Sequence, residues 1–224
     1  MAVSVAHNIA AQTPEGDAVD AVIAAGRNAA GRHWVPATSG NFSVRASATH
    51  IAITRSGVDK GALQNADVLL QDIDAPLLPG SSAEALLHVV HYREWPQTGA
   101  IFHAHGPYAT VIGRAHAGQG SVVLRGWELQ KALEGVSSHE QDIEVPVFQN
   151  DQDMERLWKR IRARLTAPPA PGLILAPGYL LAGHGLYAWG RDPKAAVRHL
   201  EALETIFQQI IILETYRHDA TDRL

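Results

Sequence analysis

The feature that most limits the fold of this chain is a series of short apolar runs, each bounded by glycine, proline or polar turn residues. Runs of this length, whether alternating or continuously apolar, are typical of β-strands. We expect strands over residues 42–45, 50–54, 67–71, 100–105, 145–148, 173–175, 179–182 and 186–189. Helix-length segments separate many of these runs, so the sequence predicts an α/β fold with a mostly antiparallel sheet covered by helices.

Two of the separating segments carry helix-start signals. Thr13 precedes a proline and a glutamate, the pattern of an N-cap with proline in the first turn, and this helix would end at Gly31. Ser81-Ser82-Ala83-Glu84 has the spacing of a capping box and would open a helix that runs to about Trp95. Further helices are expected over residues 107–116, 127–134, 151–165 and 193–216.

Length and composition fit one folded unit. The 224 residues contain 46% hydrophobic and 19% charged residues, which is ordinary for a compact α/β protein. The proline-rich segment 167–172 lies between apolar strands and is therefore expected to be a loop within a domain. We predict a single domain over residues 1–224, with residues 1–12 as a loose N-terminal extension.

The charge balance and the missing cysteines exclude several function classes. A net charge of −4 and an isoelectric point near 6.3 give no electrostatic reason to expect nucleic acid or an anionic membrane as partner. The chain has no apolar run of membrane-spanning length and no signal-peptide pattern at its start, so we expect a cytoplasmic protein. With no cysteine, any metal must be held by His, Asp or Glu.

The histidines in Phe102-His103-Ala104-His105-Gly106 form the most informative motif. Residues i and i+2 of a strand point to the same face, so His103 and His105 can offer two nitrogen ligands to one metal ion. The alternative is a pair of partly exposed histidines bonded to backbone. His184 lies between two glycines and two apolar strands, and such a histidine by itself is more often a satisfied core histidine than a metal ligand. Together the three histidines predict a His₃ zinc site with an open position, the pattern of catalytic zinc.

Two glutamates compete for an acid/base role beside such a metal. Glu84 is also the last residue of the capping-box pattern, which would explain it without catalysis. Glu128 follows a tryptophan near a helix start, and its local sequence by itself favours a solvated glutamate on a helix face over a catalytic one.

Three polar turns could hold a phosphate group: Gly40-Asn41, Ser56-Gly57 and Ser81-Ser82. Each offers backbone N–H groups or hydroxyls without bulk, and the last stands at a predicted helix N-terminus, which favours anions. The chain has neither a Walker nor a Rossmann fingerprint, so these turns do not imply a nucleotide.

In their order along the chain these motifs resemble the class II aldolase/adducin family. The matching elements are Ser39-Gly40-Asn41-Phe42-Ser43, Thr54-Arg55-Ser56-Gly57, Ser81-Ser82-Ala83-Glu84, His103-Ala104-His105 and Gly183-His184-Gly185. The resemblance covers about residues 20 to 215 and implies a three-layer fold, with a mostly antiparallel nine-stranded sheet between helices, and a homotetramer. It also implies Zn²⁺ on the three histidines and a sugar phosphate held at Asn41, Ser56, Gly57, Ser81 and Ser82.

Within the family, three stretches look most like its dehydratases, which remove water from a ketose 1-phosphate. They are residues 56–61, 127–133 and 184–190. This likeness makes Glu128 the acid/base and ranks Glu84, which matches the acid/base of the family's aldolases, second. The alternatives are an aldolase that cleaves a deoxyketose 1-phosphate such as fuculose 1-phosphate, a pentulose-phosphate epimerase, and a structural module of the adducin type that lacks the metal.

Overall fold

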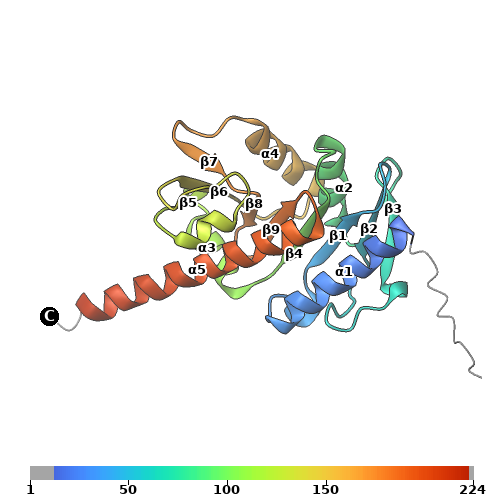
Figure 1. Ribbon diagram of the computed structural model, residues 1–224, viewed down its shortest axis with the longest axis horizontal. Helices are drawn as coiled ribbons and strands as arrows, with labels where there is room; N and C mark the ends of the chain where they lie inside the picture. The colour runs from blue at the N-terminus through green and yellow to red at the C-terminus, as the bar shows by residue number, and fades with distance from the viewer. Residues whose placement is uncertain (1–12, 222–224) are drawn as a thin grey trace, which may run out of the picture.

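The computed structural model describes residues 13–221, in which a nine-stranded sheet lies between two layers of helices (Figure 1). Eight strands follow the order β3-β2-β1-β4-β9-β8-β6-β5, and β7 pairs with β6. All strand pairs are antiparallel except β6–β7 and β6–β8. The expected three-layer, mostly antiparallel fold is confirmed.

Every predicted strand is present, with ends shifted by a few residues. The strands are β1 (Asn41–Arg45), β2 (His50–Thr54), β3 (Val68–Asp72), β4 (Ala100–Ala104), β5 (Ser121–Leu124), β6 (Asp142–Phe148), β7 (Leu173–Leu175), β8 (Gly178–Leu181) and β9 (Gly185–Gly190). The sequence did not predict β5. This four-residue edge strand buries Val122 and Leu124 and leaves Val123 exposed, so its alternation spans too few residues to stand out.

The helices occupy the expected segments with two corrections. They are α1 (Pro14–Gly31), α2 (Ala85–Glu94), α3 (Pro107–Ala115), α4 (Met154–Thr166) and α5 (Pro193–Thr221), with short 3₁₀ turns η1 (Pro36–Thr38), η2 (Asn65–Asp67) and η3 (Glu128–Ala132). The helix expected over 127–134 is only the 3₁₀ turn η3. The capping box expected at 81–84 is also wrong, because the Glu84 side chain makes no cap bond. The Thr13 cap is confirmed.

The two faces of the sheet are covered by different helices. Helices α1, α3 and α5 pack on one face, and α2 and α4 pack on the other. In Figure 1 the long α5 crosses the strands and its C-terminal half extends beyond them. No helix between residues 13 and 221 combines the length and the apolar character that a membrane span needs. The predicted extension at residues 1–12 lies outside the described part of the chain.

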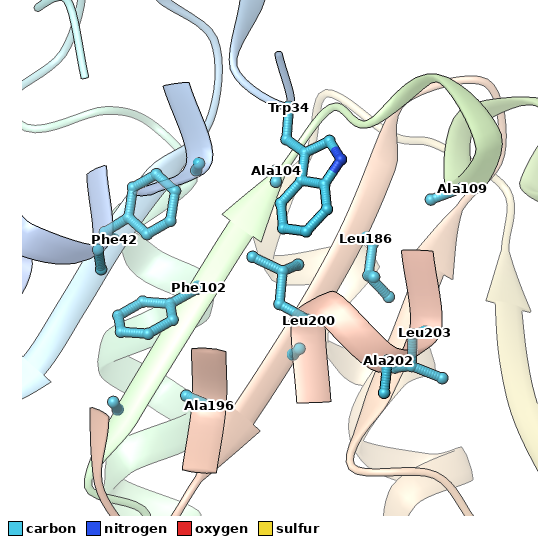
Figure 2. Packing of buried hydrophobic residues seen from close by; sticks show 14 of the residues in the cluster. Trp34, Phe42, Phe102, Ala104, Ala109, Leu186, Ala196, Leu200, Ala202 and Leu203 are labelled. Carbon is cyan, nitrogen blue, oxygen red and sulfur yellow. The ribbon is translucent and has the colours of Figure 1, made fainter. Parts of the chain in front are cut away.

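Alternation along the central strands divides their side chains between the two faces. Phe42, Phe102 and Leu186 pack with α5 residues such as Leu200 in the larger core (Figure 2). Residues one position away along the same strands face α2 and α4 instead. They include Asn41, Ser43, His103 and Tyr187, so the polar residues of three adjacent strands share one face.

Candidate metal centre and its pocket

The three predicted metal ligands meet at one end of the central strands. His103 lies near the end of β4, His105 follows that strand, and His184 lies in the turn between β8 and β9. Because β4 and β9 are antiparallel neighbours, this turn is brought beside the end of β4. One nitrogen of each ring lies within 4.8 Å of the others. The Nε2 of His103 is 2.9 Å from that of His105 and 3.3 Å from that of His184.

The outer ring nitrogens fix which atoms face the centre of this cluster. His103 Nδ1–H donates to the backbone carbonyl of Leu186 (3.1 Å), and His184 Nδ1–H donates to Asn150 Oδ1 (3.3 Å). With Nδ1 protonated, each neutral ring presents an Nε2 lone pair. Two lone pairs cannot hydrogen-bond to each other, whereas ligands on a tetrahedral zinc lie about 3.3 Å apart. The donor set therefore fits a cation.

Burial keeps His103 and His105 in the form that binds metal. His103 is fully buried and stacks on Tyr187, with ring centroids 4.0 Å apart and planes 14° from parallel. Burial lowers the pKa of His103 well below its ordinary value of 6.5. Burial and the neighbouring His184 lower the pKa of His105 to about 4. Neutral imidazole is the ligand form, so the rings need not lose protons before a metal binds.

Glu84 faces the histidines instead of capping its helix. One of its carboxylate oxygens lies 3.0 Å from His184 Nε2, and the other lies 3.6 Å from His103 Nε2 and accepts from Asn41 Nδ2 at 2.6 Å. The backbone N–H of Glu84 bonds to Ser82 Oγ. Burial alone would raise the pKa of Glu84, but the histidines and Asn41 together lower it below its ordinary range.

A polar pocket of about 300 Å³ opens beside the cluster. It is lined by Thr38, Ser39, Gly40, Asn41, Arg55, Ser56, Gly57, Lys60, Ser82, Ala83, Glu84, His105, Asn150, Asp151, Gln152, Met154 and His184. Four of the predicted phosphate residues are therefore in its wall. The fifth, Ser81, pairs with Arg55 through a β-bridge, and its hydroxyl is buried without a partner among the described residues.

Lys60 is a wall residue that the sequence reasoning missed. Its side chain is buried, and its ammonium group donates to the backbone carbonyls of Thr38 (2.6 Å) and Val58 (2.9 Å). It thereby ties together the two turns on either side of the pocket. Thr38 and its neighbour Ala37 both have positive φ, a strained conformation for residues other than glycine. Its sequence signal was its place in the 56–61 stretch, three residues after Gly57.

The structure does not bring Glu128 to this pocket. Its side chain is 72% exposed, forms an ion pair with Lys131 and lies 3.6 Å from His139. It lines a separate hollow with Trp127, Leu129 and Gln209 of α5, among others. Within one chain, Glu84 is the carboxylate beside the histidines and Glu128 is on the surface.

A buried carboxylate holds the helix that follows His105. Glu204 of α5 accepts from the backbone N–H groups of Tyr108 (3.0 Å) and Ala109 (3.1 Å), at the N-terminus of α3. Gly106 leaves the space for this contact, because a Cβ there would collide with the Glu204 carboxylate. Burial raises the pKa of Glu204 to about 7, even though the two N–H groups act to lower it.

This raised pKa makes stability depend on pH. Between pH 4.5 and 7 the unfolded chain releases the Glu204 proton while the folded chain keeps it, so the free energy of unfolding falls as pH rises. The pKa difference corresponds to about 3 kcal/mol. We expect Glu204→Gln to remove this component. In urea unfolding, the free energy of unfolding of the variant minus that of the parent should therefore be larger at pH 8 than at pH 5. An unchanged difference at the two pH values would contradict the assignment.

Comparison with known proteins gives a consistent family. The family model for the Class II Aldolase and Adducin N-terminal domain matches residues 20–211. A methylthioribulose-1-phosphate dehydratase from Bradyrhizobium sp. is 57% identical over 89% of this chain and 92% of the relative. One from Parvibaculum lavamentivorans is 46% identical over 84% of this chain and 90% of the relative.

A solved structure of a protein with a different named activity has the same fold. The L-fuculose-1-phosphate aldolase from Thermus thermophilus superimposes with a TM-score of 0.70, at 26% identity, over 89% of this chain and 97% of that one. The match thus extends over almost all of both chains. With its fold, its histidine cluster and these relatives, the chain belongs to the class II aldolase and adducin family.

Proposed function

We propose that this chain is a zinc-dependent dehydratase of methionine salvage, acting in the cytoplasm. It would convert 5-methylthioribulose 1-phosphate to 2,3-diketo-5-methylthiopentyl 1-phosphate and water. The observation that carries the proposal is the 57% identity, over 89% of this chain, to a relative with that name. The three histidines that could hold a metal support it.

The pocket is suited to the phosphate end of such a substrate. We assign phosphate binding to Ser56, Gly57 and Ser82, with Asn41 in the same wall, because they offer hydroxyl and N–H donors without bulk. Ser81, whose buried hydroxyl has no partner among the described residues, is assigned to the same group. Lys60 supplies a buried positive charge that is already fixed by two backbone carbonyls. Burial lowers the pKa of this ammonium group, and a bound phosphate would favour its charged form.

The chemistry needs a polarised ketone and a base. His103, His105 and His184 would hold a zinc ion, which would supply Lewis-acid polarisation of the ketone oxygen. The base removes the proton from C3, and the C4 hydroxyl leaves as water after it receives a proton. The resulting enol tautomerises to the 2,3-diketone, so that the overall change is the loss of one water.

We assign the acid/base role to Glu128 of a second copy of the chain. Glu128 is exposed and lines a hollow apart from the histidines of its own chain, so it can act only in an assembly. The proposed homotetramer would supply the second copy. Glu84, which lies beside the histidines in the same chain, ranks second as acid/base.

That position of Glu84 favours a second candidate function. In a retro-aldol reaction on a deoxyketose 1-phosphate such as fuculose 1-phosphate, Glu84 would be the acid/base and the histidines would hold the same metal. The fold similarity to the Thermus thermophilus aldolase agrees with this interpretation. The two candidates differ in the bond that breaks, which is C–O in the dehydratase and C–C in the aldolase.

Incubation of the zinc-loaded protein with 5-methylthioribulose 1-phosphate separates them. We expect a 2,3-diketone, trapped as its adduct with an aromatic 1,2-diamine, and no dihydroxyacetone phosphate. A parallel incubation with fuculose 1-phosphate should release no dihydroxyacetone phosphate. Release of that product would support the aldolase, and the absence of turnover on both substrates would reject both functions. Chelator-treated protein is the control.

A further inference from the structure

A line of buried hydrogen bonds connects Glu84 with the sheet beneath α2. Glu84 accepts from Asn41 Nδ2 at 2.6 Å, and Asn41 Oδ1 bonds to His88 Nε2. On the other side of its ring, His88 Nδ1 lies 2.7 Å from Ser43 Oγ. The members alternate between β1 and the start of α2, since Asn41 and Ser43 are two residues apart on the strand and Glu84 and His88 are four apart along the helix.

The Glu84 carboxylate at the end of this line determines which group donates and which accepts in every hydrogen bond. A carboxylate only accepts, so Asn41 must turn its NH₂ group toward Glu84 and its carbonyl oxygen toward His88. His88 must then carry its proton on Nε2. Its Nδ1 is left as an acceptor and receives the hydroxyl proton of Ser43.

The residues in the middle of this line are buried, so water cannot take over their hydrogen bonds. Asn41 is 3% exposed, and Ser43 and His88 are fully buried. Burial lowers the pKa of His88 to about 3, so that the ring stays neutral and has a single N–H at neutral pH. A buried polar group that loses its partner finds no water in its place.

We infer that His88 is a positioning residue of this site: its Nε2 proton fixes the orientation of Asn41, and Asn41 holds the Glu84 carboxylate toward the histidines. His88 itself neither lines the pocket nor hydrogen-bonds to the three ligands. It acts through Asn41. The consequence for catalysis rests on the proposed function, whereas the orientation of the hydrogen bonds does not.

Loss of the Nε2 donor frees the Asn41 amide to turn. If the Asn41 amide turned its oxygen toward Glu84, that oxygen and the carboxylate, both acceptors, would face each other. The carboxylate would then move away from His184. We therefore expect His88→Phe to lower kcat by about 10- to 100-fold, because Asn41 would no longer hold the Glu84 carboxylate beside the histidines; losses of this size are usual when supporting residues around a metal site are removed. The KM and the zinc content should stay near the parent values. His88→Gln, whose amide can still donate to Asn41, should retain most of the activity.

His91 provides a matched control. It lies on the same helix, is buried, and bonds to Thr98, away from Asn41 and Glu84. His91→Phe should destabilise the protein without the loss in kcat that His88→Phe causes. The decisive comparison is between His88→Phe in the parent and His88→Phe in the Glu84→Gln variant. Once Glu84 is altered, His88→Phe should cause little further loss in kcat. Equal losses in both backgrounds would overturn the inference.

A spectroscopic measurement keeps the test independent of turnover. In protein labelled with ¹⁵N-histidine, His88 should show a neutral ring with its proton on Nε2 and slow exchange of that proton. Asn41→Leu should make the exchange fast. A proton on Nδ1 would overturn the inference even in an active enzyme, and an Nε2 proton would support the orientation even if the protein fails to dehydrate the proposed substrate. Ser43→Ala is the milder variant to use if His88→Phe does not fold.

Discussion

Replacing His103 with alanine is expected to abolish zinc binding and to lower turnover by on the order of 10³-fold or more. His103 is the middle ligand, since its Nε2 is within 3.3 Å of the Nε2 atoms of both other histidines. Metal polarisation contributes several kcal/mol to stabilising a transition state, and each 1.36 kcal/mol is a factor of ten in rate.

The measurement is metal content after dialysis, alongside turnover of 5-methylthioribulose 1-phosphate. His116→Ala is the control, because His116 stands at the C-terminal end of α3 and not in the cluster. A His103→Ala protein that keeps one zinc per chain would show that the cation is held elsewhere. If the parent protein itself binds no zinc, the structural module of the adducin type becomes the better description.

Replacing Glu128 with glutamine is expected to leave zinc bound and to lower turnover by roughly 10²- to 10⁴-fold, the usual contribution of an acid/base group. The fold should be unaffected, because the Glu128 side chain is 72% exposed. Glu140→Gln is a matched control, since Glu140 is also exposed and lies outside both pockets. Full activity of Glu128→Gln would remove this residue from the mechanism.

Mixing two inactive variants tests whether Glu128 acts across subunits. His103→Ala lacks the metal but keeps Glu128, and Glu128→Gln has the reverse defect. After joint unfolding and refolding in equal amounts, about a quarter of the sites would combine an intact metal centre with an intact Glu128 from a neighbour in a random homo-oligomer. Activity should therefore return in the mixture. No recovery would exclude the Glu128 of a neighbouring subunit from the site.

The sheet and the His103–His105 pair were predictable because both depend on short-range patterns. Apolar alternation marked every strand except β5, which has four residues. The spacing of His103 and His105 places two rings on one side of a strand end. Their approach to His184 depends on the pairing of β4 with β9, which no local pattern encodes. It was predicted from the chemistry of a three-histidine donor set and from the family resemblance.

The roles of polar residues near the site were less predictable. Ser81-Ser82-Ala83-Glu84 fits a capping box as a local pattern, but a cluster of imidazoles and the Asn41 amide offer Glu84 stronger partners than its own backbone. Tertiary contacts also decide the state of His88 and Lys60, which look like ordinary helix and loop residues in the sequence. Glu128 is the opposite case. Within a single chain its side chain is exposed and lies apart from the histidines, so the structure of one chain gives it no catalytic partner.

Asn41, His103 and Tyr187 form one row across β1, β4 and β9, paired residue by residue. A single inserted or deleted residue within any of these strands would turn its contribution to the opposite face, where α5 packs. Changes in length should therefore be tolerated in the outer loops, such as residues 167–172, and not in these three strands. Relatives of this chain that keep the activity are expected to differ in loop length and to align without gaps over residues 41–45, 100–105 and 183–190.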